Sequence, residues 1–77
     1  MATRAFILIE TQVGKGRDVV TELRTYADVE TVDAITGPYD VIALIESADM
    51  GAMADLVTGK VQGIRGVMRT ITCVTAG

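Results

Sequence analysis

The stretch that decides the fold is TGPYDVIALIE, which runs from Thr36 to Glu46. It begins with the turn signal Gly37-Pro38, places an aromatic ring beside a carboxylate at Tyr39-Asp40, and continues with five apolar residues, Val41 to Ile45. A short unbroken apolar run that follows a turn predicts a β-strand covered on both of its faces. In a chain of only 77 residues, it is not obvious what covers the second face.

Length and composition limit the answer. A chain of 77 residues predicts one domain, residues 1–77, which buries roughly 60% of its unfolded surface. Its one cysteine, Cys73, excludes an internal disulfide, so a core of this size supplies only about 3–5 kcal/mol and association is expected to add stability. The net charge of −3 argues against a basic surface for nucleic acid or anionic lipid. No apolar run exceeds five residues, against about 20 for a membrane span. We expect a cytoplasmic domain with no direct nucleic-acid or membrane contact.

Hydrophobic periodicity predicts six elements in the order βαββαβ. Strands are predicted at 3–11, 29–36, 40–46 and 66–75, and helices at 15–26 and from Asp49, a candidate N-cap, to Gly63. The apolar faces of the two helices are formed by Val19, Val20, Leu23 and Ala27 in the first and by Met53, Leu56, Val57 and Val61 in the second. Gly59 costs the second helix about 1 kcal/mol relative to alanine, and close packing is one explanation for it.

The two halves of the chain echo each other. With a shift of 36 residues, Leu8-Ile9-Glu10 aligns with Leu44-Ile45-Glu46, and Ile35-Thr36 aligns with Ile71-Thr72. Each half is then one strand–helix–strand unit, which indicates an α+β, ferredoxin-like fold. Right-handed crossovers place both helices on one face of a four-stranded antiparallel sheet.

The other face of this sheet should be polar in a monomer, but the strands are apolar on both sides. Phe6 and Leu8 point one way while Ile7 and Ile9 point the other, and the run from Val41 to Ile45 alternates in the same manner. Soluble monomers rarely expose such a patch. Burying about 600–800 Å² per subunit gives an ordinary dimer interface. We therefore predict a dimeric α/β sandwich in which a second copy covers the open face.

The turn and the last strand carry the candidate binding residues. Asp40 beside Tyr39 is either a carboxylate for a cationic ligand group, next to turn amides that suit an anion, or a local cap of the hairpin. Thr70 and Thr72 offer hydroxyls on one face of the last strand, although threonine is also a common strand former.

Other site classes are not supported by the sequence. Gly14-Lys15-Gly16-Arg17 lacks the spacing of a phosphate loop. Cys73 lies in an apolar strand of a chain without histidine, which predicts a small core residue rather than a nucleophile. One cysteine, no histidine and no clustered carboxylates predict neither a metal site nor a cofactor. No nucleophile–base pair is present, so we predict that the protein is not an enzyme. The strand DVIALIE also lacks the aromatic platform of RNA-recognition domains.

Two motifs carry a resemblance to a known family. Gly37-Pro38-Tyr39-Asp40 matches a G-x-[YF]-D turn into an apolar strand, and the segment from Gly66 to Thr72 matches G-V-x-x-T-x-T. At this spacing the chain resembles, over essentially its whole length, the effector-binding domain of the Lrp/AsnC transcriptional regulators, the "regulation of amino acid metabolism" (RAM) domain. Full regulators of this family carry an N-terminal helix-turn-helix domain. This chain begins directly in the first strand, so it resembles the stand-alone form without a DNA-binding domain.

The resemblance implies a small-molecule sensing and assembly module in transcriptional regulation. It implies dimers that assemble further into a ring of dimers, an amino-acid effector bound in clefts between neighbouring dimers, and co-assembly with full-length Lrp/AsnC regulators. Carried over by motif, the ligand-binding residues are Gly37, Tyr39, Asp40, Thr70 and Thr72. Two alternatives stay open: a small dimeric α/β-barrel enzyme, such as a cofactor-free monooxygenase, and a purely structural oligomer.

Overall fold

A computed structural model describes residues 2–76; residues 1 and 77, the ends of the predicted domain, lie outside the described range. The elements are β1 (Thr3–Thr11), α1 (Gly16–Leu23), β2 (Val29–Ala34), β3 (Val41–Ser47), α2 (Met50–Leu56), a π-helical turn η1 (Val57–Val61) and β4 (Val67–Val74). The predicted order βαββαβ is confirmed. Within residues 2–76 no helix is long and apolar enough to cross a membrane.

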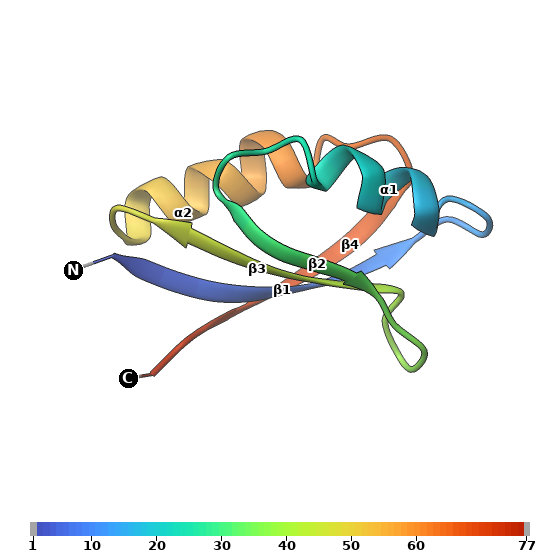
Figure 1. Ribbon diagram of the computed structural model, residues 1–77, viewed down its shortest axis with the longest axis horizontal. Helices are drawn as coiled ribbons and strands as arrows, with labels where there is room; N and C mark the ends of the chain where they lie inside the picture. Colours follow the sequence, from blue (N-terminus) through green and yellow to red (C-terminus); the bar gives the residue numbers. More distant parts are fainter. Residues whose placement is uncertain (1, 77) are drawn as a thin grey trace.

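The sheet is four-stranded, in the order β2-β3-β1-β4, and every neighbouring pair is antiparallel. Both helices lie on the same face of this sheet, and the opposite face has no helix over it (Figure 1). In the central strand β1, Ile7 pairs with Ala43 of β3 on one side and with Thr72 of the edge strand β4 on the other. The predicted ferredoxin-like architecture is therefore confirmed.

The core lies between the sheet and the two helices. Alternate residues of the central strands face the helices and are fully buried: Ala5, Ile7 and Ile9 in β1, and Val41, Ala43 and Ile45 in β3. The helices contribute Val19, Val20, Leu23, Met53, Leu56, Val57 and Val61, all buried. Periodicity thus predicted both helix faces correctly, except that Ala27 is exposed.

The ends of the helices follow local hydrogen bonding. Asp49 caps α2 as predicted, because its Oδ1 accepts the backbone N–H of Ala52 at 2.8 Å. The prediction that the first helix reaches residue 26 is wrong: α1 ends at Leu23, and the N–H of Tyr26 turns back to the carbonyl of Leu23 at 3.1 Å. Tyr26 thereby packs against the core as a turn residue.

The second helix ends in a wider turn than the sequence predicts. In η1 the N–H of Gln62 bonds to the carbonyl of Val57 at 2.8 Å, five residues back rather than four. Gly59 lies in this turn, and a Cβ added there would meet nothing within 4 Å. Close packing is therefore not the reason for glycine at this position.

The face away from the helices, here called the open face, is apolar at its centre. Its apolar side chains are Phe6 and Leu8 of β1, Ile42 and Leu44 of β3, and Ile71 of β4, as the register of paired residues establishes. Phe6 is 41% exposed and Ile71 is 39% exposed. Cys73, which pairs with Phe6, is exposed on this face. The prediction that Cys73 is a core residue is wrong, because the sheet side it occupies is not the one that the helices cover.

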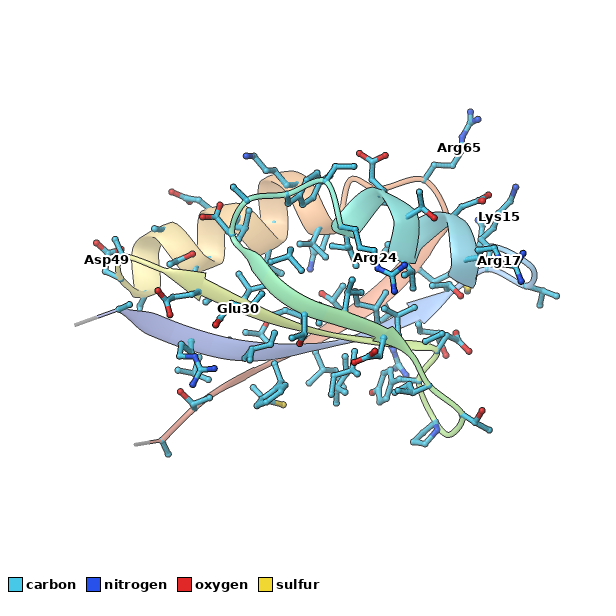
Figure 2. The ribbon with its side chains drawn as sticks, viewed as in Figure 1. Lys15, Arg17, Arg24, Glu30, Asp49 and Arg65 are labelled. Carbon is cyan, nitrogen blue, oxygen red and sulfur yellow. The ribbon has the colours of Figure 1, made fainter. Side chains whose placement is uncertain are left out.

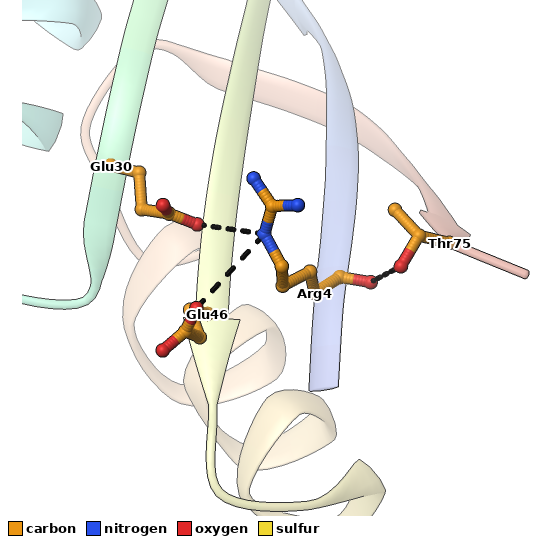
Figure 3. Close-up of polar contacts among 4 residues, drawn as sticks. All are labelled: Arg4, Glu30, Glu46 and Thr75. Atoms are coloured by element: carbon orange, nitrogen blue, oxygen red, sulfur yellow. Dashed lines mark hydrogen bonds and ion pairs between the residues drawn. The ribbon is translucent and has the colours of Figure 1, made fainter. Parts of the chain in front are cut away.

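Charged side chains border the open face at both ends. At one end Arg4 Nε lies 3.1 Å from Glu30 Oε2 and 4.0 Å from Glu46 Oε2, and the carbonyl of Arg4 accepts the Thr75 hydroxyl at 3.1 Å (Figure 3). At the other end Arg69 Nε lies 3.7 Å from Glu10 Oε1. An apolar centre with a polar rim is the arrangement found in protein–protein interfaces.

Candidate ligand-binding site

The first half of the predicted site is the turn between β2 and β3. The turn is closed by a hydrogen bond of 2.9 Å from the N–H of Ile35 to the carbonyl of Asp40. Gly37 adopts a φ of +155°, outside the range that side-chain-bearing residues favour, so the turn depends on glycine there. The N–H of Asp40 donates to the carbonyl of Ile9 at 2.9 Å, which ties the turn to β1.

The Asp40 carboxylate has a structural partner. Its Oδ2 accepts the backbone N–H of Thr11 at 2.8 Å and the Thr11 hydroxyl at 3.3 Å. Thr11 lies beyond the last β1–β3 pair, Ile9↔Val41, and at a register shift in the pairing with β4. The carboxylate therefore replaces a backbone carbonyl where the ladder ends. Among the described residues, no hydrogen bond is made to Oδ1 of Asp40, so this oxygen is available to another group.

Tyr39 extends from the turn toward β4. The guanidinium carbon of Arg69 lies 5.7 Å from the centroid of the Tyr39 ring, and Arg69 is also the ion-pair partner of Glu10. Arg69 points to the open side of the sheet, because it pairs with Glu10 next to the buried Ile9. The turn and β4 thus bring the aromatic ring of Tyr39 and the guanidinium of Arg69 together at one end of the open face.

The second half of the predicted site lies on the other side of the sheet. Thr70 pairs with Ile9 and Thr72 with Ile7, and both partners are buried beneath the helices, so the two hydroxyls face the helical layer. They border a groove of about 390 Å³ between β4 and the second helix. The groove is lined by Met50, Met53, Ala54, Val57, Thr58, Gln62, Thr70, Thr72 and Val74, none of which is charged. Gln62 Nε2 donates to Thr70 Oγ1 at 2.9 Å.

Within one chain the two halves do not meet. Ile9 pairs with Val41 on one side and with Thr70 on the other, so the end of the turn and Thr70 are two strand spacings apart, roughly 10 Å. Thr70 and Thr72 face the helices, whereas Tyr39 lies over Arg69 on the open side. The structure brings Gly37, Tyr39 and Asp40 together, and it separately brings Thr70 and Thr72 together.

The residues that sequence reasoning missed come from the second helix. Gln62, Met50 and Met53 line the same groove as the two threonines. Helical spacing indicated that Met53 is on the inner face, but the position of Gln62 depends on the π-helical turn, for which the sequence gives no periodic signal.

A larger hollow of about 490 Å³ lies between α1 and the π-helical turn and contains none of the predicted ligand residues. It is lined by Lys15, Asp18, Glu22, Tyr26, Gly59, Lys60, Gly63, Ile64 and Arg65. Burial and, to a smaller extent, the charge of Glu22 raise the pKa of Tyr26, and Lys60 Nζ lies 5.9 Å from the Tyr26 ring centroid. The Arg65 side chain extends away from the ribbon (Figure 2). Charges of both signs line the hollow, from three basic and two acidic side chains.

A metal site is not formed by the described side chains. Within residues 2–76, no three side chains of histidine, cysteine, aspartate or glutamate gather into a group that could hold a metal ion.

Transcriptional regulators and their ligand-binding domains are similar to this chain in sequence. A family model described as the Lrp/AsnC ligand binding domain matches residues 4–76. The HTH-type transcriptional regulator FL11 of Pyrococcus horikoshii is 31% identical over 74 residues, which cover 92% of this chain and 48% of that regulator. The chain thus spans about half the length of the curated relatives it matches.

Solved structures share the fold. The crystal structure of FFRP-DM1 superposes with a TM-score of 0.92 at 27% identity, covering 96% of this chain and 99% of that one. A complex of the transcriptional regulator NMB0573 with L-Met, from Neisseria meningitidis, superposes with a TM-score of 0.88 at 21% identity, covering 97% of this chain and 50% of that one. The second likeness shows the fold alone. Because the family model matches residues 4–76, the chain belongs to the family of Lrp/AsnC ligand-binding domains.

Proposed function

We propose that this domain binds a free amino acid and assembles with further copies of the fold to regulate transcription. The observation that carries the proposal is the uncharged groove that holds both predicted hydroxyls, Thr70 and Thr72, beside the second helix. The family is defined by ligand binding, and one regulator with this fold was solved as a complex with L-Met. The domain then acts as a binding module rather than as an enzyme.

Assembly is the first step, because the open face needs a cover. Its apolar centre is bordered at both ends by the ion pairs of Arg4 and Arg69. Two copies related by a two-fold axis would bury the apolar residues against one another and leave the charged rim in water. A second copy of this chain is therefore the occupant that we propose for the open face.

The ligand site then forms between neighbouring dimers of a ring. An α-amino acid presents an ammonium and a carboxylate on one carbon, so its site needs an acceptor and a donor close together. The hydroxyls of Thr70 and Thr72 supply donors for the carboxylate. Because the turn of the same chain lies roughly 10 Å away across the sheet, the Asp40 carboxylate that accepts the ammonium comes from another copy, together with Gly37 and Tyr39.

The proposed regulatory role is supported by the relatives of the domain, which are transcriptional regulators. FL11 is an HTH-type regulator of about twice the matched length. We propose that the present domain, without direct contact to nucleic acid, assembles with full-length Lrp/AsnC regulators in the cytoplasm, and that a bound amino acid alters the joint assembly.

A thermal-shift screen of the twenty amino acids, followed by titration calorimetry on each positive, tests this function. We expect at least one amino acid to raise the melting temperature in a concentration-dependent way, since a ligand that binds only the folded state stabilises it by RT ln(1 + [L]/Kd). Calorimetry should then give saturable binding. If none of the twenty stabilises or binds the assembled protein, the domain is a structural oligomer and the proposal is wrong.

A further inference from the structure

The π-helical turn places Gln62 against β4. The π-helical turn closes the second helix, whose last residue is Val61, and the chain then turns toward β4. Gln62 follows η1 directly, and its N–H closes the turn on the carbonyl of Val57 at 2.8 Å. Its side chain thereby reaches Thr70, eight residues further along the chain.

The contact between Gln62 and Thr70 fixes the polarity of the Thr70 hydroxyl. Gln62 Nε2 donates to Thr70 Oγ1 at 2.9 Å. A hydroxyl has one hydrogen to donate. Because its oxygen already accepts from the amide, the Thr70 hydrogen is left for a different acceptor. Gln62 thus prepares Thr70 as a donor, which is what a ligand carboxylate requires.

The rest of the groove is apolar or neutral. Met50, Met53, Val57 and Val74 supply apolar surface, and Thr58 and Thr72 supply hydroxyls. Burying a charged side chain without a partner is costly, and no lining residue offers an opposite charge. Methionine side chains are unbranched and flexible, so they adapt to apolar groups of varied shape. A volume of about 390 Å³ lies in the range of small-molecule sites, about 300–1,000 Å³.

We infer that the groove selects amino acids with an uncharged, apolar side chain, and that Gln62 is a positioning residue that directs the Thr70 hydroxyl to the ligand carboxylate. This inference rests on the proposed function and narrows it. The ligand side chain lies against Met50, Met53 and Val57, and its carboxylate lies at Thr70.

The test is titration calorimetry of the assembled protein with methionine, leucine, lysine and glutamate. Methionine or leucine should bind at least tenfold more tightly than lysine or glutamate, since a lost or unpaired charged contact changes affinity by about one decade or more. Tighter binding of lysine or glutamate would overturn the inference while leaving the proposed function intact. Failure of all four amino acids, and of the remaining sixteen, would overturn both.

The role of Gln62 is tested with Gln62→Glu, whose carboxylate would accept the Thr70 hydrogen and withdraw the donor. Binding of the apolar amino acid should weaken at least tenfold at pH 7. The matched control Gln12→Glu places the same charge in the exposed loop after β1 and should leave affinity unchanged. Equal affinity for Gln62→Glu and wild type would overturn the assignment.

The dependence of affinity on pH distinguishes a positioning role of Gln62 from a purely structural one. Protonation of the introduced carboxyl near pH 4.3 restores a donor toward Thr70, so the affinity ratio of wild type to Gln62→Glu should shrink between pH 7 and pH 4.5. The charged side chains nearest to Gln62 are Arg69, which lines a second hollow together with Gln62, and Lys60 in η1. A ratio that does not change with pH would overturn the positioning role. Should Gln62→Glu not fold, Gln62→Leu removes the amide without adding charge, and binding as tight as wild type would overturn the role equally.

Discussion

The two carboxylate oxygens of Asp40 have different surroundings. Oδ2 holds the amide and hydroxyl of Thr11 at the end of the β1–β3 ladder, while Oδ1 is open to a ligand. The sequence left a local cap of the hairpin and a ligand contact as alternatives, and the contact that the structure establishes is a different one, to Thr11 of β1 outside the hairpin. The partner, Thr11, lies 29 residues away and could not be predicted, because it depends on the strand register and on the shift in the β1–β4 pairing between Glu10 and Thr11.

We expect Asp40→Ala to lower the free energy of unfolding by about 1–3 kcal/mol, because a partly buried backbone amide loses its charged acceptor. Asp40→Asn keeps a carbonyl oxygen for Thr11 and should lose less than about 1 kcal/mol. Urea denaturation of both variants, at one protomer concentration, measures the difference. Equal losses in the two variants would show that the Thr11 contact contributes nothing.

The same pair of variants tests the ligand role of the charge. Both should weaken amino-acid binding by about tenfold to a hundredfold, because a hydrogen bond to a charged group contributes about 1.5–3 kcal/mol. Calorimetry decides the point. Wild-type affinity in Asp40→Asn would confine Asp40 to its structural role.

Tyr26 makes the free energy of unfolding decrease as the pH rises in the alkaline range. Burial, and then the charge of Glu22, raise its pKa in the folded protein, so between the unfolded and folded pKa values the folded state binds more protons. Stability contributed by Tyr26 is therefore complete below about pH 10, its unfolded pKa, and is lost as pH rises through the folded pKa. Urea midpoints from pH 8.5 to 11.5 should fall less steeply for Tyr26→Phe than for wild type. Parallel curves would contradict this assignment.

The strands and the inner faces of the helices could be predicted from the sequence, whereas the end of the second helix could not. Alternation in β1 and β3 gave the two faces of the sheet, and spacing gave Met53, Leu56 and Val57 as inner residues. Which strand face the helices cover follows from the crossovers in three dimensions. The π-helical turn leaves no periodic trace over five residues, and it decides that Gln62 joins the groove with Thr70.

Glycines at two positions should respond in opposite ways to alanine. A Cβ at Gly59 meets nothing within 4 Å, so Gly59→Ala should stabilise the helix end by about 0.5–1 kcal/mol. Gly66 has a φ of +101°, and a Cβ there would lie 2.8 Å from Lys15 Cβ; Gly66→Ala should destabilise by about 1–3 kcal/mol. Urea unfolding measures both. A destabilised Gly59→Ala would indicate that the π-helical turn itself requires glycine.

Both faces of the central strand β3 are apolar. The run from Val41 to Ile45 is covered by the helices on one face, and Ile42 and Leu44 on its other face belong to the open face. Sequence predicted that two sets of apolar side chains exist but did not identify the outer set. The structure assigns Leu8, which pairs with Ile42 and Ile71, to the open face and buries Ile7 in the core. The predicted ligand residues Thr70 and Tyr39 lie on two sides of the sheet, so the proposed site needs a second copy to bring these two groups together.

Sedimentation equilibrium at micromolar protein tests self-association through the open face, on which the proposed site depends. Wild type and Thr21→Glu, which adds a charge on the exposed side of α1, should sediment as dimers or larger assemblies. Leu8→Glu should sediment as a folded species of about 8.1 kDa, the mass of one chain, because a carboxylate at the centre of the interface would be buried without a partner. A wild-type protein that is folded and monomeric at this concentration would contradict the account.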